Sequence, residues 1–162
     1  MTLQNTPNRK YGFNLEKINP QESLFHAIYF LDYETGSLLV SNRFSDNLSF
    51  LRDDLICSFL NAINLFINEL KEGVNEELQE INFKDTRILY EREGRLLVIA
   101  VTRKTDLRIE RGIIREILED FYLRFKNYIN NFNGAIAPAI IDYKKRLKAM
   151  NLNTLFKFNT GF

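Results

Sequence analysis

The stretch from Leu55 to Asn68, LICSFLNAINLFIN, is fourteen residues long and contains no charged residue, no glycine and no proline. A charge-free stretch of this length stands out because 27% of the residues in the chain are charged. The acidic pair Asp53-Asp54 precedes it, and Glu69 follows it. The pattern predicts one helix from Leu48 to Lys71 that is apolar on almost all sides, and such a helix is usually buried on more than one side.

A helical projection divides this predicted helix into two sides. We assign one side to the core of the protein, and it holds Leu48, Leu51, Leu55, Phe59, Ala62, Phe66 and Leu70. The opposite side also carries no charge, whereas a solvated helix would carry lysine and glutamate there. We therefore predict that this opposite side contacts a partner or a second copy of the chain through Cys57, Leu60, Asn61, Asn64, Ile67 and Asn68.

The length of 162 residues and the 45% hydrophobic content fit one domain with one core. The net charge of +1 provides no overall field that would attract nucleic acid. The charge is unevenly spread, since residues 1–20 carry +2 and residues 142–162 carry +4, which leaves −5 for the rest. We expect a flexible basic arm at 1–20, a domain at 21–151 and an aromatic tail at 152–162.

The remaining hydrophobic pattern predicts five strands and two further helices. The strands are expected at 24–31, 37–44, 78–84, 86–91 and 96–102, with the third at an edge of the sheet and the last at its centre. The second long helix, at 107–130, is amphipathic with a charged outer face that includes Arg108, Arg115 and Glu119. Its predicted core stripe is Ile113, Ile114, Ile117, Leu118, Phe121, Phe125 and Tyr128. Because the chain places charges on the outer face of this helix, the absence of charge from 55 to 68 is unusual by comparison.

A third helix, at 139–150, is predicted to direct lysines outward, namely Lys144, Lys145 and Lys148, and apolar residues inward, namely Ile140, Ile141, Tyr143 and Leu147. Two interpretations of the lysines remain open. They form either a solvated helix back, with the phenylalanine-rich tail folded against the body, or a surface that contacts anionic lipid or an acidic partner. The second interpretation would place the protein at the periphery of a membrane.

The residues that could carry chemistry are few. His26 is the only histidine and lies in an apolar strand, and Cys57 has no neighbouring base, so we expect structural roles for both. The glycines form no phosphate-binding motif, and one histidine with one cysteine cannot make a structural zinc site within one chain. We expect no enzyme activity and no cofactor. A lone cysteine, no signal-peptide pattern and no membrane-spanning apolar run predict a cytoplasmic protein.

The order strand, strand, helix, three strands, helix, helix resembles the longin/roadblock superfamily, and within it the small stand-alone proteins of archaea. The sequence Ile28-Tyr29-Phe30-Leu31-Asp32 with Thr35-Gly36 in the first hairpin, and the apolar strand 96–102 before the second long helix, carry the resemblance. It implies an α+β fold with an antiparallel sheet in the order 2-1-5-4-3, one long helix on one face and two helices on the other.

The resemblance also implies a non-enzymatic role. Such domains pair with each other and act as scaffolds on small GTPases or on vesicle-trafficking machinery, and their first long helix and an outer strand commonly build the contact surface. Two other classes of function remain as alternatives. A small-molecule-sensing domain would need an internal apolar cavity with converging polar groups, and a small enzyme would need a nucleophile, base or metal cluster that the sequence does not show.

Overall fold

The computed structural model describes residues 23–44, 53–70 and 77–150. The predicted start of the first long helix at Leu48, the arm at 1–20 and the tail at 152–162 lie outside the described residues. The ends of the other predicted elements agree with the structure to within one or two residues. The described elements are β1 (Phe25–Asp32), β2 (Leu38–Arg43), α2 (Asp53–Leu70), β3 (Glu80–Asn82), β4 (Arg87–Glu93), β5 (Leu96–Thr102), α3 (Leu107–Asn130) and α4 (Pro138–Ala149).

The strands form one antiparallel sheet in the order β2-β1-β5-β4-β3, as predicted. All residues of β1 and β5 are buried, because both of their faces are covered and both of their edges are paired. Their continuous apolar sequences fit this position better than an alternating pattern would. The predictions of a central strand at 96–102 and of an edge strand after the first long helix are confirmed.

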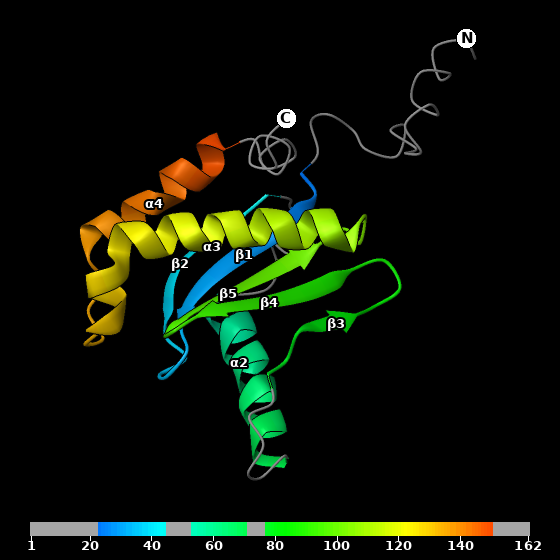
Figure 1. The fold of residues 1–162 in the computed structure, drawn as a ribbon, viewed down its shortest axis with the longest axis horizontal. Helices are drawn as coiled ribbons and strands as arrows, with labels where there is room; N and C mark the ends of the chain where they lie inside the picture. Colours follow the sequence, from blue (N-terminus) through cyan, green and yellow to red (C-terminus); the bar gives the residue numbers. More distant parts are fainter. Residues whose placement is uncertain (1–22, 45–52, 71–76, 151–162) are drawn as a thin grey trace.

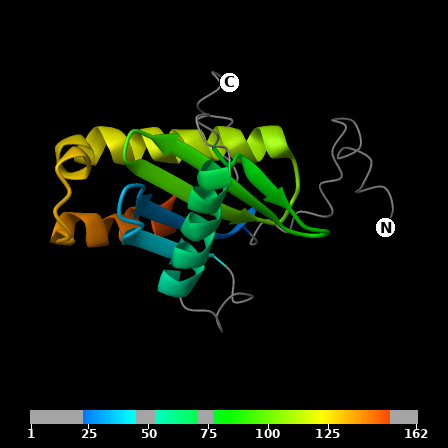
Figure 2. The same cartoon turned by 90° about the horizontal axis from the view of Figure 1, so that it is seen from below.

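The sheet separates the helices into two layers. Figures 1 and 2 show α3 and α4 on one face of the sheet and α2 on the other, which confirms the predicted α+β architecture. The larger apolar cluster lies under α3 and α4, where the rings of Phe30 and Phe121 stack with centroids 4.5 Å apart and Tyr143 meets both edge-on. The cluster under α2 is smaller. Within the described residues, no helix combines the length and the apolar composition that a membrane span requires.

The predicted stripe of α3 is buried from Ile113 to Phe121, while Phe125 and Tyr128 are half-buried. Glu110 is also fully buried, which the hydrophobic pattern did not predict. Its Oε1 accepts hydrogen bonds from Arg87 Nη1 (2.8 Å) and Thr102 Oγ1 (2.9 Å), and its Oε2 accepts one from the Thr105 backbone N–H (2.7 Å). These partners offset the loss of hydration, so the carboxylate ties the start of α3 to β4 and β5.

Asp32 connects the two hairpin turns at the other end of the sheet. Its carboxylate accepts two hydrogen bonds from the Arg95 guanidinium, at 2.8 and 2.9 Å, and further bonds from the backbone and the hydroxyl of Thr35. Burial alone would raise the pKa of Asp32, but these bonds outweigh it and hold the pKa below its usual value. Asp32 is therefore ionised at neutral pH and stabilises both turns.

Replacing Glu110 with alanine should lower the free energy of unfolding by about 3–5 kcal/mol, because Arg87 Nη1 and the Thr102 hydroxyl would lose their buried acceptor. Urea denaturation measures the change. The control is Glu119→Ala, at an exposed position of the same helix, which should cost no more than about 0.5 kcal/mol. Similar losses in the two variants would contradict the structural role of Glu110.

The pKa of Asp32 makes the stability of the protein depend on pH. A carboxyl group with a depressed folded-state pKa stabilises the fold above its unfolded pKa of about 3.9, and this contribution is lost as the pH falls through the folded-state value. The difference in unfolding free energy between the wild type and Asp32→Asn should therefore shrink as the pH is lowered below about 3.9. Urea titrations at neutral and acidic pH test this, and a difference that stays constant would refute it.

Candidate functional site

The inner face of α2 packs against the protein's own sheet and consists of Cys57, Leu60, Asn61 and Asn64. These four side chains are at most 6% exposed. Cys57 and Leu60 join the apolar cluster on this side of the sheet, which includes Tyr90 of β4. Figure 1 shows that α2 does not lie flat on the sheet but extends away from it. The sheet therefore covers only one side of the helix.

Two hydrogen bonds hold α2 in its rotational orientation. The Tyr90 hydroxyl donates to the backbone carbonyl of Leu60 at 3.1 Å, and the Leu78 backbone N–H donates to Asn64 Oδ1 at 3.1 Å. Burial raises the pKa of Tyr90, so its hydroxyl remains a donor over the physiological range. A buried hydroxyl and a buried amide are costly without partners, and with this side of α2 facing the sheet the Tyr90 hydroxyl and the Asn64 amide are both paired.

Small side chains allow α2 to approach the β1–β2 turn closely. Gly36 has a φ of +75°, which favours glycine, and a Cβ atom there would lie only 2.8 Å from Asn61 Nδ2. The helix and the turn thus meet where the turn has a glycine and the helix has an asparagine. A phenylalanine at position 61 would not fit in this space.

The assignment of the two faces of α2 from the sequence is therefore wrong. Phe59 and Phe66, which were predicted to be in the core, are 65% and 62% exposed, and Ala62 between them is exposed as well. Four of the residues predicted to contact a partner, Cys57, Leu60, Asn61 and Asn64, instead face the sheet. Other side chains named in the two predictions lie outside the described ones, namely those of Leu48, Leu51, Leu55, Ile67, Asn68 and Leu70.

The reversal has a physical reason. The stretch 55–68 carries no charge on either side, so the charge pattern could not separate the sides, and hydrophobicity favoured burial of the phenylalanines. The side that faces the sheet is instead the one that forms the two hydrogen bonds and the close approach to Gly36. A signal for this was present in the sequence. Small and amide side chains, here Cys57, Asn61 and Asn64, repeat at a spacing of three or four residues, which suits close approach to a sheet better than a row of phenylalanines does.

The outer face of α2 consists of Ser58, Phe59, Ala62, Leu65 and Phe66, all of which are exposed. Three of these side chains are among the six large hydrophobic ones that are exposed in the described part of the chain. Single exposed hydrophobic residues are ordinary, but a cluster of them within two helical turns and without a charge among them is typical of an interaction surface.

The edge strand β3 lies on the same flank of the molecule as α2. Among the described residues its only strand partner is β4, so the backbone groups on its other side form no ladder. Ile81 packs half-buried against the apolar cluster under α2, and Phe83, just after β3, is 53% exposed. The hydrogen bond from Leu78 to Asn64 links the start of this segment to α2. The outer face of α2 and the β3 edge together form the candidate interaction surface.

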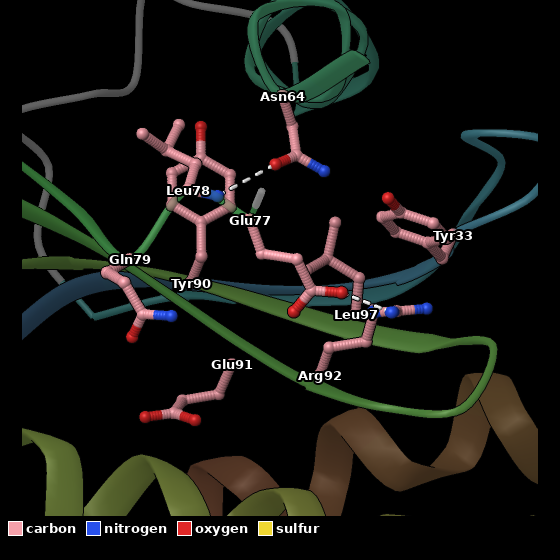
Figure 3. Close-up of a pocket in the computed structure, with 9 residues that line it drawn as sticks. All are labelled: Tyr33, Asn64, Glu77, Leu78, Gln79, Tyr90, Glu91, Arg92 and Leu97. Atoms are coloured by element: carbon pink, nitrogen blue, oxygen red, sulfur yellow. Dashed lines mark hydrogen bonds and ion pairs between the residues drawn. The ribbon is translucent and has the colours of Figure 1, made fainter. Parts of the chain in front are cut away.

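A small pocket lies between α2, the segment before β3 and the strands β4 and β5 (Figure 3). Arg92 pairs with Glu77 at its rim and lies over the ring of Tyr33, 4.1 Å from the ring centroid. The volume of the pocket is about 90 Å³, well below the roughly 300–1,000 Å³ of sites that enclose small molecules. This pocket gives no support to the alternative of a small-molecule sensor.

The candidate reactive residues have structural surroundings. His26 is buried, and both burial and the nearby Arg103 lower its pKa, so it is neutral at physiological pH. Cys57 is 1% exposed, on the inner face of α2. Among the residues that the structure describes, no group of three or more histidine, cysteine, aspartate or glutamate side chains could hold a metal ion.

The lysines of α4 point outward as predicted. Lys145 and Lys148 are exposed, and Lys144 is half-buried. Ile141 was predicted to be inward, but it is 56% exposed. The contact of α4 with the rest of the protein follows Ile140, Tyr143 and Leu147, and Ile141 lies about 100° around the helix from Ile140. Contact of these lysines with an anionic surface stays a prediction.

Comparison with models of protein families finds no match, and comparison with curated protein sequences finds none either. Among solved structures, the chain is similar to a chain from a homology model of the full-length AP-3 complex in a stretched open conformation. The alignment covers 84% of this chain and 98% of that chain, with 10% sequence identity and a TM-score of 0.44.

The orientation of α2 predicts a large loss of stability for a substitution on its inner face and a small change for one on its outer face. Leu60→Ala should lower the free energy of unfolding by about 2–5 kcal/mol, because it leaves a cavity against the sheet. Phe66→Ala, on the outer face, should change it by no more than about 0.5 kcal/mol. Urea denaturation at low protein concentration, where association does not contribute, compares the two. A larger loss for Phe66→Ala than for Leu60→Ala would contradict the orientation.

Proposed function

We propose that this protein is a non-enzymatic interaction module that pairs with a second copy of itself through the outer face of α2. The observation that carries the proposal is the exposure of Phe59, Leu65 and Phe66 on a helix with no charged residue between positions 55 and 68. Water contact with such a face is unfavourable, and burying it against another apolar surface is favoured by about 25 cal/mol per Å² of apolar area.

The sequence of the outer face suits contact with itself. Ala62 is small and lies between the two large side chains Phe59 and Phe66. In an antiparallel contact about a two-fold axis near Ala62, Phe59 of one copy lies opposite Phe66 of the other. The helices can then approach closely at the alanine, while the phenylalanines fill the space on either side. No like charges would face each other across this axis, since this part of α2 carries none.

The β3 edge and Phe83 extend the proposed surface beyond α2. Backbone N–H and C=O groups along an open edge can pair with an extended segment of another chain. This combination of a first long helix and an outer strand is the contact surface that the longin/roadblock resemblance implies. If a related domain from a different protein occupied the same surface, the pair would be a heterodimer instead of a homodimer.

The resemblance also supplies the broader role. We propose that the paired module acts as a scaffold on a small GTPase or on a complex that resembles vesicle-trafficking machinery, in the cytoplasm, where the thiol of Cys57 stays reduced. A pull-down with the intact protein from its own cytosol tests this part. Recovery of no GTPase and no trafficking component in either nucleotide state would remove it while leaving the pairing intact.

The variant Phe59→Glu with Phe66→Glu tests the pairing itself. Sedimentation velocity over a range of concentrations should show a dimer for the wild type and a monomer for the variant, because the glutamates would have to be desolvated in the contact. The control is Leu123→Glu, which changes a still more exposed apolar side chain on α3, at 78% exposure. The control should remain a dimer. A wild type that is monomeric at high concentration, together with a variant that keeps every cytosolic partner, would refute the proposed surface.

A further inference from the structure

The helix α4 is held to the body of the protein in one orientation. Ile140, Tyr143 and Leu147 are buried against the core. Asp120 of α3 accepts hydrogen bonds from the Tyr143 hydroxyl at 2.7 Å and from Arg146 Nε at 2.9 Å. Burial would raise the pKa of Asp120, but the bonds from its partners outweigh this and lower it, so the group is anionic. Asp120 also pairs with Arg124 of α3, so the charge of the arginine of α4 is only partly compensated. These contacts fix which side of α4 points outward.

The outward side of α4 carries three lysines and one carboxylate. The side chain of Lys145 is 86% exposed and lies 3.8 Å from Asp142, which is itself 66% exposed, so this pair is weak. Lys148 is exposed and Lys144 is half-buried, and neither forms an ion pair with a carboxylate in the described part of the chain. The side therefore presents a net positive charge to the solvent.

Apolar residues accompany the lysines. Ile141, on the exposed part of α4, is 56% exposed. The twelve residues that follow α4 and Met150 in the sequence contain Leu152, Leu155, Phe156, Phe158 and Phe162 together with Lys157 and no acidic residue. A sequence that combines lysine with leucine and phenylalanine is typical of segments that lie in the headgroup region of a membrane.

We propose that the outward side of α4, formed by Ile141, Lys144, Lys145 and Lys148, docks on an anionic lipid membrane. Lysines on a juxtamembrane surface attract lipid phosphates and carboxylates, and apolar side chains beside them enter the interface between headgroups and acyl chains. The inference is independent of the proposed pairing, because α4 and α2 lie on opposite faces of the sheet (Figures 1 and 2).

The type of cation favours lipid over an acidic protein. Arginine is the residue that recognises fixed carboxylates in protein contacts, because its planar group forms two parallel hydrogen bonds. The arginine of α4, Arg146, is already occupied by Asp120. The cations that remain are lysines on flexible stems, which suit a diffuse layer of headgroups whose positions are not fixed.

Co-sedimentation of the full chain with vesicles tests the proposal. The protein should bind phosphatidylcholine vesicles that contain phosphatidylserine, should bind pure phosphatidylcholine vesicles much more weakly, and should lose affinity as salt is added. Lys144→Gln with Lys145→Gln and Lys148→Gln should weaken binding to the anionic vesicles on the order of a hundredfold, from about fivefold for each lysine. Circular dichroism and the midpoint of thermal unfolding should match those of the wild type.

The matched control removes three cations elsewhere, with Lys84→Gln, Arg108→Gln and Arg115→Gln in the β3–β4 turn and the first half of α3. It has the same net charge as the test variant, and its affinity should fall much less, because the cations it removes lie on other elements than the proposed docking side. An equal loss in the two variants would overturn the proposal, since it would show that only net charge matters. So would a wild type that does not bind anionic vesicles, and the side of α4 would then fit an acidic protein instead.

Discussion

The hydrogen bond from the Tyr90 hydroxyl to the carbonyl of Leu60 and the one from Leu78 to Asn64 fix which side of α2 faces the sheet. The stretch 55–68 carries no charge, and on hydrophobicity alone the side with Phe59, Leu65 and Phe66 would be the more favourable one to bury. The side that faces the sheet instead carries Asn64, and the buried Tyr90 hydroxyl and the Asn64 amide are both paired there, so neither has the cost of an unpaired polar group. Because the side with Asn64 faces the sheet, the phenylalanines on the opposite side of α2 point outward.

Carboxylates that accept several hydrogen bonds hold the remaining elements together. Glu110 joins α3 to β4 and β5, Asp32 joins two turns at the opposite end of the sheet, and Asp120 joins α3 to α4. Each accepts several hydrogen bonds from arginine and hydroxyl groups, so its charge is compensated locally. These carboxylates connect elements that are distant in the sequence. In the described part of the chain, the outer face of α2 and the outward side of α4 are the exposed surfaces with an unusual composition.

The two surfaces differ in chemistry as well as in position. The outer face of α2 is apolar and uncharged, which suits a protein surface of the same kind, while the outward side of α4 is basic, which suits a layer of diffuse negative charge. Because the sheet lies between them, both can be occupied at once. We therefore propose a module that pairs on one side and meets a membrane on the other, a combination that would concentrate a scaffold on a membrane surface.

The sequence by itself determined the order and type of the elements, the centre and one edge of the sheet and the outward lysines of α4, because these depend on local periodicity and on apolar runs. The burial of Glu110 could not be predicted, since its partners Arg87 and Thr102 become neighbours only in the folded sheet. The orientation of α2 was predicted in reverse. A pattern of hydrophobicity shows that a helix has two apolar sides, but only the tertiary structure, through Tyr90, Gly36 and the segment around Leu78, decided which side the sheet accepts.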